Sequence, residues 1–326
     1  MIYFFISEAL GNQMFKYASG KSYCLDREME FRYYRPEKNL YGDDDLKYGR
    51  DLETIFNIPS YERVYSLPKS VEPLNLRKDQ RQNNKVLTDY DIKDESYIKE
   101  FDWSPRTFYH RIDEIRNWFK FPEDINSDAE TIINDVRDSY INKKIIAVHF
   151  RTGYGYSGAG AIIGYKYYTR AASYIQSLFG NENVIYLLFY DIESSYVNRF
   201  RKKHKCLNPE HSSLVMDMSL MSKCDGAIIA NSTFSTWACL LGNMDCVCCP
   251  SRSPIWGKYL PDYVYADEWK RIRSRVSLKS FIHLKMKRAG GFLFRYLSKV
   301  KVLYFLAGFL PEKFKNKLSD FCNKNC

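Results

Sequence analysis

The segment DGAIIANSTFSTWACLLG, residues 225–242, decides which fold the sequence predicts. Its apolar run ends at Asn231, and Ser232, Thr233 and Ser235 then open a stretch with helical spacing. Because Ser, Thr and Asn are the usual helix N-caps, a strand that leads directly into a helix is expected here. The first turn of that helix suits either an ordinary cap or a bound phosphate, since its N–H groups and positive end attract anions.

The same strand–loop–helix pattern comes earlier in the chain. IIAVHF (145–150) is a buried run, a glycine-rich loop follows at 151–164, and helical spacing resumes at 166–179. NVIYLLFYD (183–191) is the next apolar run, and CVCCP (246–250) is a last short one. Strands that alternate with helices predict a parallel sheet with helices on both faces.

The start of the chain predicts a second unit of the same class. IYFFIS (2–7) is a continuous apolar run, and helical spacing follows at 12–27. Two such series, joined near 125–144, predict an α/β protein with two facing Rossmann-like domains. We place the domains at 1–140 and 141–269, and a basic amphipathic helical tail at 270–326.

The composition excludes several classes of protein. The net charge of +10 favours acidic partners, but no nucleic-acid-binding motif is present. The nine Cys are an odd number without zinc-ligand spacing, which indicates reduced thiols in a cytoplasmic protein and no metal site. The apolar run at the start is too short for a signal peptide or a membrane span.

The carboxyl ends of the predicted strands carry the candidate site residues. In open parallel sheets, ligands bind beyond these ends. Arg151 follows one strand and could bridge phosphate oxygens, or it could be a solvated arginine in a loop. His149 is expected in the core of that strand, and Asp191 and Glu8 are the carboxylates best placed to act as a base.

The turn EALGNQMF (8–15) contributes a further group of candidates. Gly11, Asn12 and Gln13 stand at the start of the first predicted helix. Their amides could bind sugar hydroxyls, or they could cap the helix. The turn lacks the glycine spacing of a dinucleotide fingerprint.

Three segments together resemble the α-1,2-fucosyltransferases of glycosyltransferase family 11. They are LGNQMFKYASGKS (10–22), VHFRTG (148–153) and LMSKCDGAIIANSTFSTW (220–237), and the resemblance extends over residues 1 to about 256. It implies a GT-B-like fold in which the N-terminal domain binds the acceptor and the C-terminal domain binds the donor. The implied reaction is inverting transfer of L-fucose from GDP-fucose to a galactoside hydroxyl, α-1,2, in surface polysaccharide synthesis, with no metal or other cofactor.

The resemblance assigns roles to the candidate residues. It implies that the N-terminal domain binds the acceptor glycan, for which we expect Gly11, Asn12 and Gln13. From their places after predicted strands, we expect Arg151 and Asp191 to act in catalysis. The donor nucleotide would be bound by a larger set of residues. These are His149, Arg151, Asn231, Ser232, Thr233 and Ser235.

Departures from the family pattern leave two other functions open. The usual His-apolar-Arg-Arg-Gly-Asp loop has Thr152 and Tyr154 in place of its second Arg and its Asp, and Glu8 and Ala9 replace two glycines. A related enzyme could use another nucleotide sugar. A catalytically silent glycan-binding member of a polysaccharide assembly complex is the other alternative.

The sequence leaves two locations open for the predicted tail. FLFRYLSKVKVLYFLAGFL (292–310) is apolar but carries Arg295, Lys299 and Lys301, which a membrane span would bury at about 2.5–3.5 kcal/mol each. A helix lying on the inner face of the plasma membrane would bring these charges to anionic headgroups. Packing on the protein itself is the alternative.

Overall fold

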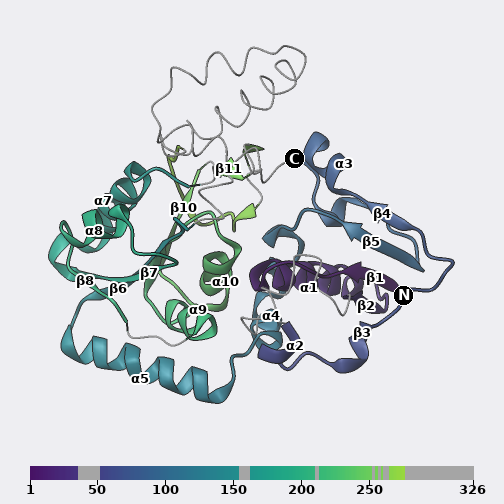
Figure 1. Cartoon of the computed structure of the whole chain (residues 1–326), viewed down its shortest axis with the longest axis horizontal. Coiled ribbons are helices and arrows are strands. Elements are labelled where there is room, and N and C mark those ends of the chain that lie inside the picture. The colour runs from purple at the N-terminus through teal and green to yellow at the C-terminus, as the bar shows by residue number, and fades with distance from the viewer. Residues whose placement is uncertain are drawn as a thin grey trace, which may run out of the picture. The chain divides into compact units, whose positions relative to one another are not determined.

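The computed structural model describes residues 1–35, 52–153, 162–209, 213–251, 254–255, 258–259 and 264–275 (Figure 1). All of these belong to one compact unit, Met1–Ser277. Residues 154–161 of the glycine-rich loop and the predicted tail from residue 276 onward lie outside the described residues.

The first half of the unit is built on a five-stranded parallel sheet with the order β3-β2-β1-β5-β4. Its central strand β1 forms from the predicted apolar run at 2–7. The strands are β1 (Ile2–Phe5), β2 (Phe31–Tyr34), β3 (Arg63–Val64), β4 (Pro73–Asn75) and β5 (Ser96–Glu100). The helices are α1 (Leu10–Leu25), α2 (Leu52–Ile55), α3 (Arg77–Asn83) and α4 (Ile112–Trp118), with 3₁₀ turns at Ser60–Glu62, Leu87–Asp89, Pro105–Thr107 and Tyr109–Arg111.

The second half contains a six-stranded parallel sheet with the order β13-β10-β9-β6-β7-β8. The strands are β6 (Lys144–Phe150), β7 (Val184–Tyr190), β8 (Cys206–Leu207), β9 (Gly226–Ile228), β10 (Cys246–Pro250) and β13 (Lys270–Ile272), and β11 (Pro254–Ile255) and β12 (Lys258–Tyr259) form a separate antiparallel pair. The helices are α5 (Glu123–Ser139), α7 (Lys166–Phe179), α8 (Ser195–Arg201), α9 (Leu214–Ser222) and α10 (Thr233–Leu241), with a 3₁₀ turn at Asn181–Asn183.

This architecture confirms the predicted class, an α/β protein with two parallel-sheet domains. Two details differ from the sequence prediction. The join expected near 125–144 is largely helix α5, which packs on α9. The second sheet also extends into the segment assigned to the tail, because β13 pairs with β10 over Cys248–Pro250.

The two halves share one hydrophobic core, and Trp237 of α10 lies at their junction. Its ring is fully buried, with its centroid 4.8 Å from that of Phe15 in α1. It also stacks on Phe108 at 5.6 Å and meets the edge of Phe119 at 5.0 Å. The indole Nε1 donates a hydrogen bond to the carbonyl oxygen of Gly11 at 2.9 Å. Because a buried indole needs a partner for its N–H, this bond fixes the start of α1 against α10.

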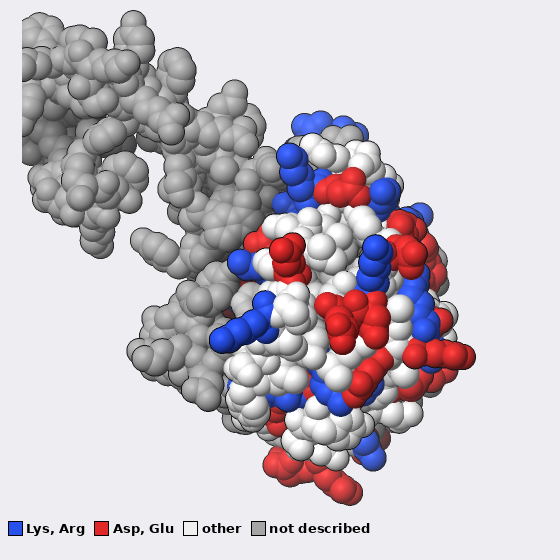
Figure 2. Space-filling model, turned by 90° about the vertical axis from the view of Figure 1, so that its right-hand side faces the viewer, with Lys and Arg blue, Asp and Glu red and all other residues white. Residues whose placement is uncertain are grey.

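Surface charge and hydropathy add two observations. On the face shown in Figure 2, acidic and basic side chains of the described residues are interspersed, so the described part of this face carries no patch of one sign. Within the described ranges, no helix has the length and apolar character needed to cross a membrane.

Candidate functional site

The order of the second sheet brings three predicted site segments to one edge. Strand β6 lies between β9 and β7 and runs parallel to both. The residues that follow these strands therefore emerge side by side. Arg151 follows β6, Asp191 follows β7, and Asn231 lies beyond β9. The geometry is that of a ligand site at the carboxyl end of a parallel sheet.

Asp191 organises the loop that begins at Arg151. Its Oδ1 accepts a hydrogen bond from the Thr152 N–H at 2.9 Å, and its Oδ2 accepts one from the Gly153 N–H at 2.8 Å. The Arg151 guanidinium lies 3.1 Å from Oδ2. A Cβ at residue 153 would lie only 2.2 Å from the same oxygen, so the arrangement requires glycine. Asp191, predicted as catalytic, thus holds the loop that follows β6 and orients Arg151.

His149 is a buried imidazole at the end of β6. Burial, and to a lesser degree the charge of Arg151, lowers its pKa to about 3, so the ring is neutral at neutral pH. Its Nδ1 has no hydrogen-bond partner among the described residues. A buried polar atom without a partner costs about 1–3 kcal/mol, a cost that a bound ligand can remove. The ring centroid lies 5.5 Å from that of Phe234 in the first turn of α10.

The start of α10 has the features of an anion site. Ser232 is the N-cap, but its side chain makes no capping hydrogen bond, and the first turn contains no acidic residue. The Ser232 carbonyl accepts bonds from the hydroxyls of Ser235 at 3.2 Å and Thr236 at 3.0 Å. Ser235, predicted to bind the donor, is fully buried, and its hydroxyl bonds the carbonyl at the start of its own helix. The backbone amides of the first turn and the positive helix end suit a negatively charged group.

The start of α1 meets the start of α10 at Gly11. A Cβ on Gly11 would lie 2.7 Å from Thr233 Oγ1 and 2.9 Å from the Phe234 nitrogen. The structure therefore brings the residues predicted for acceptor and donor binding together, because only glycine allows this approach.

The two amides predicted to bind sugar hydroxyls make contacts within the protein. Gln13 is buried; its Nε2 donates to the Glu8 carbonyl at 2.7 Å and its Oε1 accepts from the Leu52 N–H at 3.2 Å. Asn12 Nδ2 donates to Glu8 Oε2 at 2.6 Å. Gln13 therefore supports the turn, whereas Asn12 orients a carboxylate.

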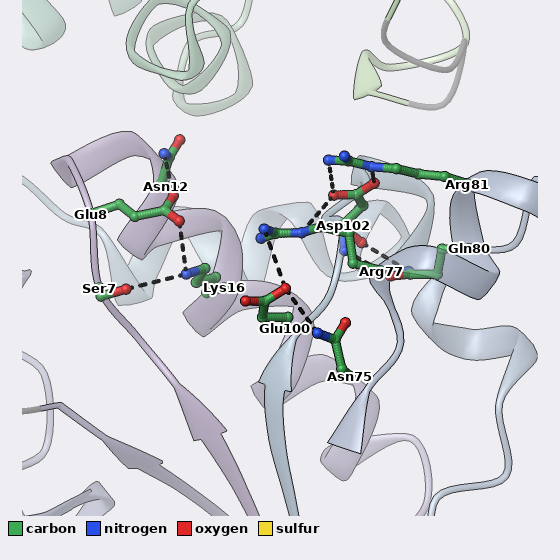
Figure 3. Close-up of polar contacts among 10 residues, drawn as sticks. All are labelled: Ser7, Glu8, Asn12, Lys16, Asn75, Arg77, Gln80, Arg81, Glu100 and Asp102. Carbon is green, nitrogen blue, oxygen red and sulfur yellow. Dashed lines mark hydrogen bonds and ion pairs between the residues drawn. The ribbon is translucent and has the colours of Figure 1, made fainter. Parts of the chain in front are cut away.

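A polar cluster at the carboxyl edge of the first sheet was not predicted (Figure 3). Arg77 Nε lies 3.2 Å from Asp102 Oδ1. The Arg81 guanidinium donates hydrogen bonds to both carboxylate oxygens of Asp102. Glu100 accepts a bond from Asn75 at 2.9 Å. The only signal in the sequence was charged residues after short strands, in a polar region without a recognisable motif.

Lys16 is the buried cation of this cluster. Its Nζ lies 3.5 Å from Glu8 Oε1 and 3.5 Å from Ser7 Oγ (Figure 3). Burial lowers the pKa of Lys16, and the charge of Glu8 opposes this shift. Across the described part of the chain, no group of three or more His, Cys, Asp or Glu side chains could hold a metal ion.

Comparisons with known proteins relate this chain to glycosyltransferases. No family model matches the sequence. The chain is similar to the O-antigen biosynthesis glycosyltransferase WbnK of Escherichia coli, with 26% identity over 283 residues, 75% of this chain and 91% of the relative. It is also similar to an alpha-1,2-colitosyltransferase of Escherichia coli, with 26% identity over 261 residues, 74% of this chain and 87% of the relative.

A solved structure shares the fold. The selenomethionine form of fucosyltransferase NodZ from Bradyrhizobium superposes with a TM-score of 0.50 at 13% sequence identity, covering 74% of this chain and 92% of that one. The chain is thus similar in sequence to glycosyltransferases, and its two parallel-sheet domains have the GT-B-like architecture of a fucosyltransferase.

Proposed function

We propose that the chain is an inverting glycosyltransferase that moves L-fucose from GDP-fucose to a galactoside hydroxyl, in α-1,2 linkage, during synthesis of a surface polysaccharide. The names of the two relatives support sugar transfer, and the name of the first also supports O-antigen synthesis. The resemblance of three sequence segments to α-1,2-fucosyltransferases supports the donor and the linkage.

One observation carries the proposal: the carboxyl edge of the second sheet combines Arg151, the neutral imidazole of His149 and the start of α10. A nucleotide diphosphate presents charged oxygens that a guanidinium can bridge. The helix start supplies amide donors without an opposing acidic side chain. In this proposal, these groups stabilise the negative charge that develops on the leaving GDP.

The junction of the two helix starts supports the geometry of transfer. Gly11 contacts Thr233, so an acceptor bound at the edge of the first sheet lies next to a donor bound at the second. The acceptor oxygen forms a bond to the anomeric carbon while the bond from that carbon to the diphosphate oxygen breaks. The electron pair leaves with GDP, and attack from the opposite face inverts the anomeric centre.

A second candidate donor has its own support, because one relative is a colitosyltransferase. The distinction between fucose and colitose depends on contacts to the sugar ring. Residues 154–161, which follow Arg151 and Gly153, fall outside the described residues. We therefore treat colitosyl transfer as the alternative within the same reaction.

A panel of donors tests the proposal. Purified protein would be incubated with a galactose-terminated acceptor and with GDP-fucose, GDP-colitose, GDP-mannose or UDP-galactose, in the presence of EDTA. We expect GDP release and an α-linked product with GDP-fucose. Transfer from GDP-colitose alone would favour the second candidate, and glycan binding without turnover of any donor would favour a catalytically silent protein.

A further inference from the structure

Glu8 has an unusual backbone conformation at the carboxyl end of β1. Its φ is +82°, in the region that favours glycine. A side chain in this region costs on the order of 1–3 kcal/mol and persists only where surrounding contacts determine it. Such residues gather at functional sites. The conformational cost of a glutamate at this position therefore indicates that the Glu8 side chain has a role of its own.

The carboxylate of Glu8 is held by two side chains of α1. Asn12 donates to Oε2 at 2.6 Å, and Lys16 Nζ lies 3.5 Å from Oε1 (Figure 3). The Lys16 side chain is 3% exposed, whereas that of Glu8 is 22% exposed. One amide and one buried cation thus orient a carboxylate that solvent, and hence a substrate, can reach.

The position of Glu8 relates it to the proposed donor site. Its partner Asn12 directly follows Gly11, which contacts Thr233 at the start of α10. Glu8 therefore precedes α1 close to the point where α1 meets α10 at Gly11, on the side of the first sheet. Asp191, the carboxylate predicted at the end of β7, instead accepts bonds from the N–H groups of the loop that follows β6.

We propose that Glu8 is the catalytic residue that accepts the proton of the attacking acceptor hydroxyl. This inference rests on the proposed function. As the bond from the acceptor oxygen to the anomeric carbon forms, the proton of that oxygen passes to a Glu8 carboxylate oxygen. The diphosphate departs with its electron pair, so atoms and charge balance, and Asn12 and Lys16 act as positioning residues.

Glu8→Gln tests the proposal with nearly unchanged size. We expect kcat for transfer to fall by about 10²–10⁴-fold, because the amide cannot accept the proton. The affinity for GDP, measured by titration calorimetry, should change little. The thermal midpoint should fall, because the buried Lys16 ammonium loses the carboxylate beside it, but the variant should remain folded at the assay temperature. Glu100→Gln is the matched control: Glu100 belongs to the same polar cluster but bonds Asn75 at 2.9 Å, and its variant should retain kcat within about threefold.

A second variant separates catalysis from folding. Glu8→Gly suits the backbone at φ +82° and leaves space for a small anion. We expect an inactive but folded enzyme whose transfer rate rises with added formate or azide. The same anions should not accelerate the wild type.

Two results would overturn the assignment of Glu8. One is a Glu8→Gln enzyme with a wild-type kcat, whether or not the KM for the acceptor rises. The other is a fully active Glu8→Gly enzyme without added anion. A wild type that binds no GDP and turns over no donor would instead contradict the proposed function on which the assignment rests.

Discussion

The sequence predicts one candidate base at the carboxyl edge of each sheet, Glu8 and Asp191, and the two carboxylates are bound in different ways. Asp191 is fixed by two backbone N–H groups and Arg151, and a glycine makes room for it. Glu8 is oriented by two side chains on a strained backbone. A residue that follows a parallel strand thus lies near the expected ligand site. Its hydrogen-bond partners then indicate whether its side chain supports a loop or is available to contact a substrate.

Removal of the Trp237 ring, which packs between the two halves, should have the largest effect on stability. Trp237→Ala would empty a fully buried site shared by Phe15, Phe108 and Phe119. We expect the free energy of unfolding to fall by about 3–5 kcal/mol, measured by urea denaturation. Trp237→Phe, which keeps most of the packing but loses the bond to Gly11, should cost less. Equal stability of the alanine variant and the wild type would show that the halves do not depend on this contact.

Arg151→Ala should have the next largest effect and should act on function alone. The side chain is 37% exposed, so its removal should leave the thermal midpoint nearly unchanged. We expect transfer to fall by about 10²–10³-fold, because the leaving diphosphate loses a charged donor. Arg201→Ala, at an exposed pair with Glu193, serves as the control. Near-normal turnover of the Arg151 variant would refute the donor-site assignment.

A pH-dependent effect should appear in the second half, at Asp217 of α9. Burial raises the pKa of this carboxyl to about 7. The folded state therefore binds the proton more tightly than the unfolded state, and this contribution to stability is lost as the pH rises from about 4 to 7. Above pH 7, Asp217→Asn should raise the free energy of unfolding by roughly 2–3 kcal/mol relative to wild type, allowing for partial exposure.

A measurement at low pH serves as the control. Near pH 4, where Asp217 is protonated in the folded state, the wild type and Asp217→Asn should have similar free energies of unfolding. Denaturation curves recorded from pH 4 to 8 would show the difference appear gradually. A difference that is the same at every pH would contradict a raised pKa at this residue.

The smallest effect is expected at a surface pair between the halves. Arg106 binds Asp267 with two guanidinium nitrogens, the closest contact being 2.7 Å, but the two side chains are 45% and 62% exposed. Arg106→Ala should lower the free energy of unfolding by less than about 1 kcal/mol, and less still at high salt. A double-mutant cycle with Asp267→Ala measures the coupling. A value above about 2 kcal/mol would make this pair a major link between the halves.

The second half could be predicted well from the sequence because its central strands β6, β7 and β9 are long or fully buried. The apolar runs at 145–150 and 183–191 became β6 and β7, and the segment that opens at Asn231 became α10. Parallel order then gathered Arg151, Asp191 and Asn231 at one edge. The local sequence pattern was sufficient to predict these strands, because a continuous apolar run indicates a strand that is buried on both faces of its sheet.

The details of the first half could not be predicted because long-range contacts determine them. Strands β3 and β4 contain two and three residues, too few for a periodic pattern. The sequence also does not show that Gln13 accepts a hydrogen bond from the distant Leu52 N–H. Nor does it show that the Ser235 hydroxyl bonds the Ser232 carbonyl. The sequence contained one indication of the positive φ at Glu8, because the family that it resembles usually has glycine at that position.

The most direct test of the account is a crystal structure of the chain with bound GDP. The account predicts diphosphate oxygens within hydrogen-bond distance of the Arg151 guanidinium and of the backbone amides at the start of α10, with Glu8 on the opposite side of the donor sugar's position. GDP bound at the edge of the first sheet, or a diphosphate that contacts neither Arg151 nor α10, would contradict it.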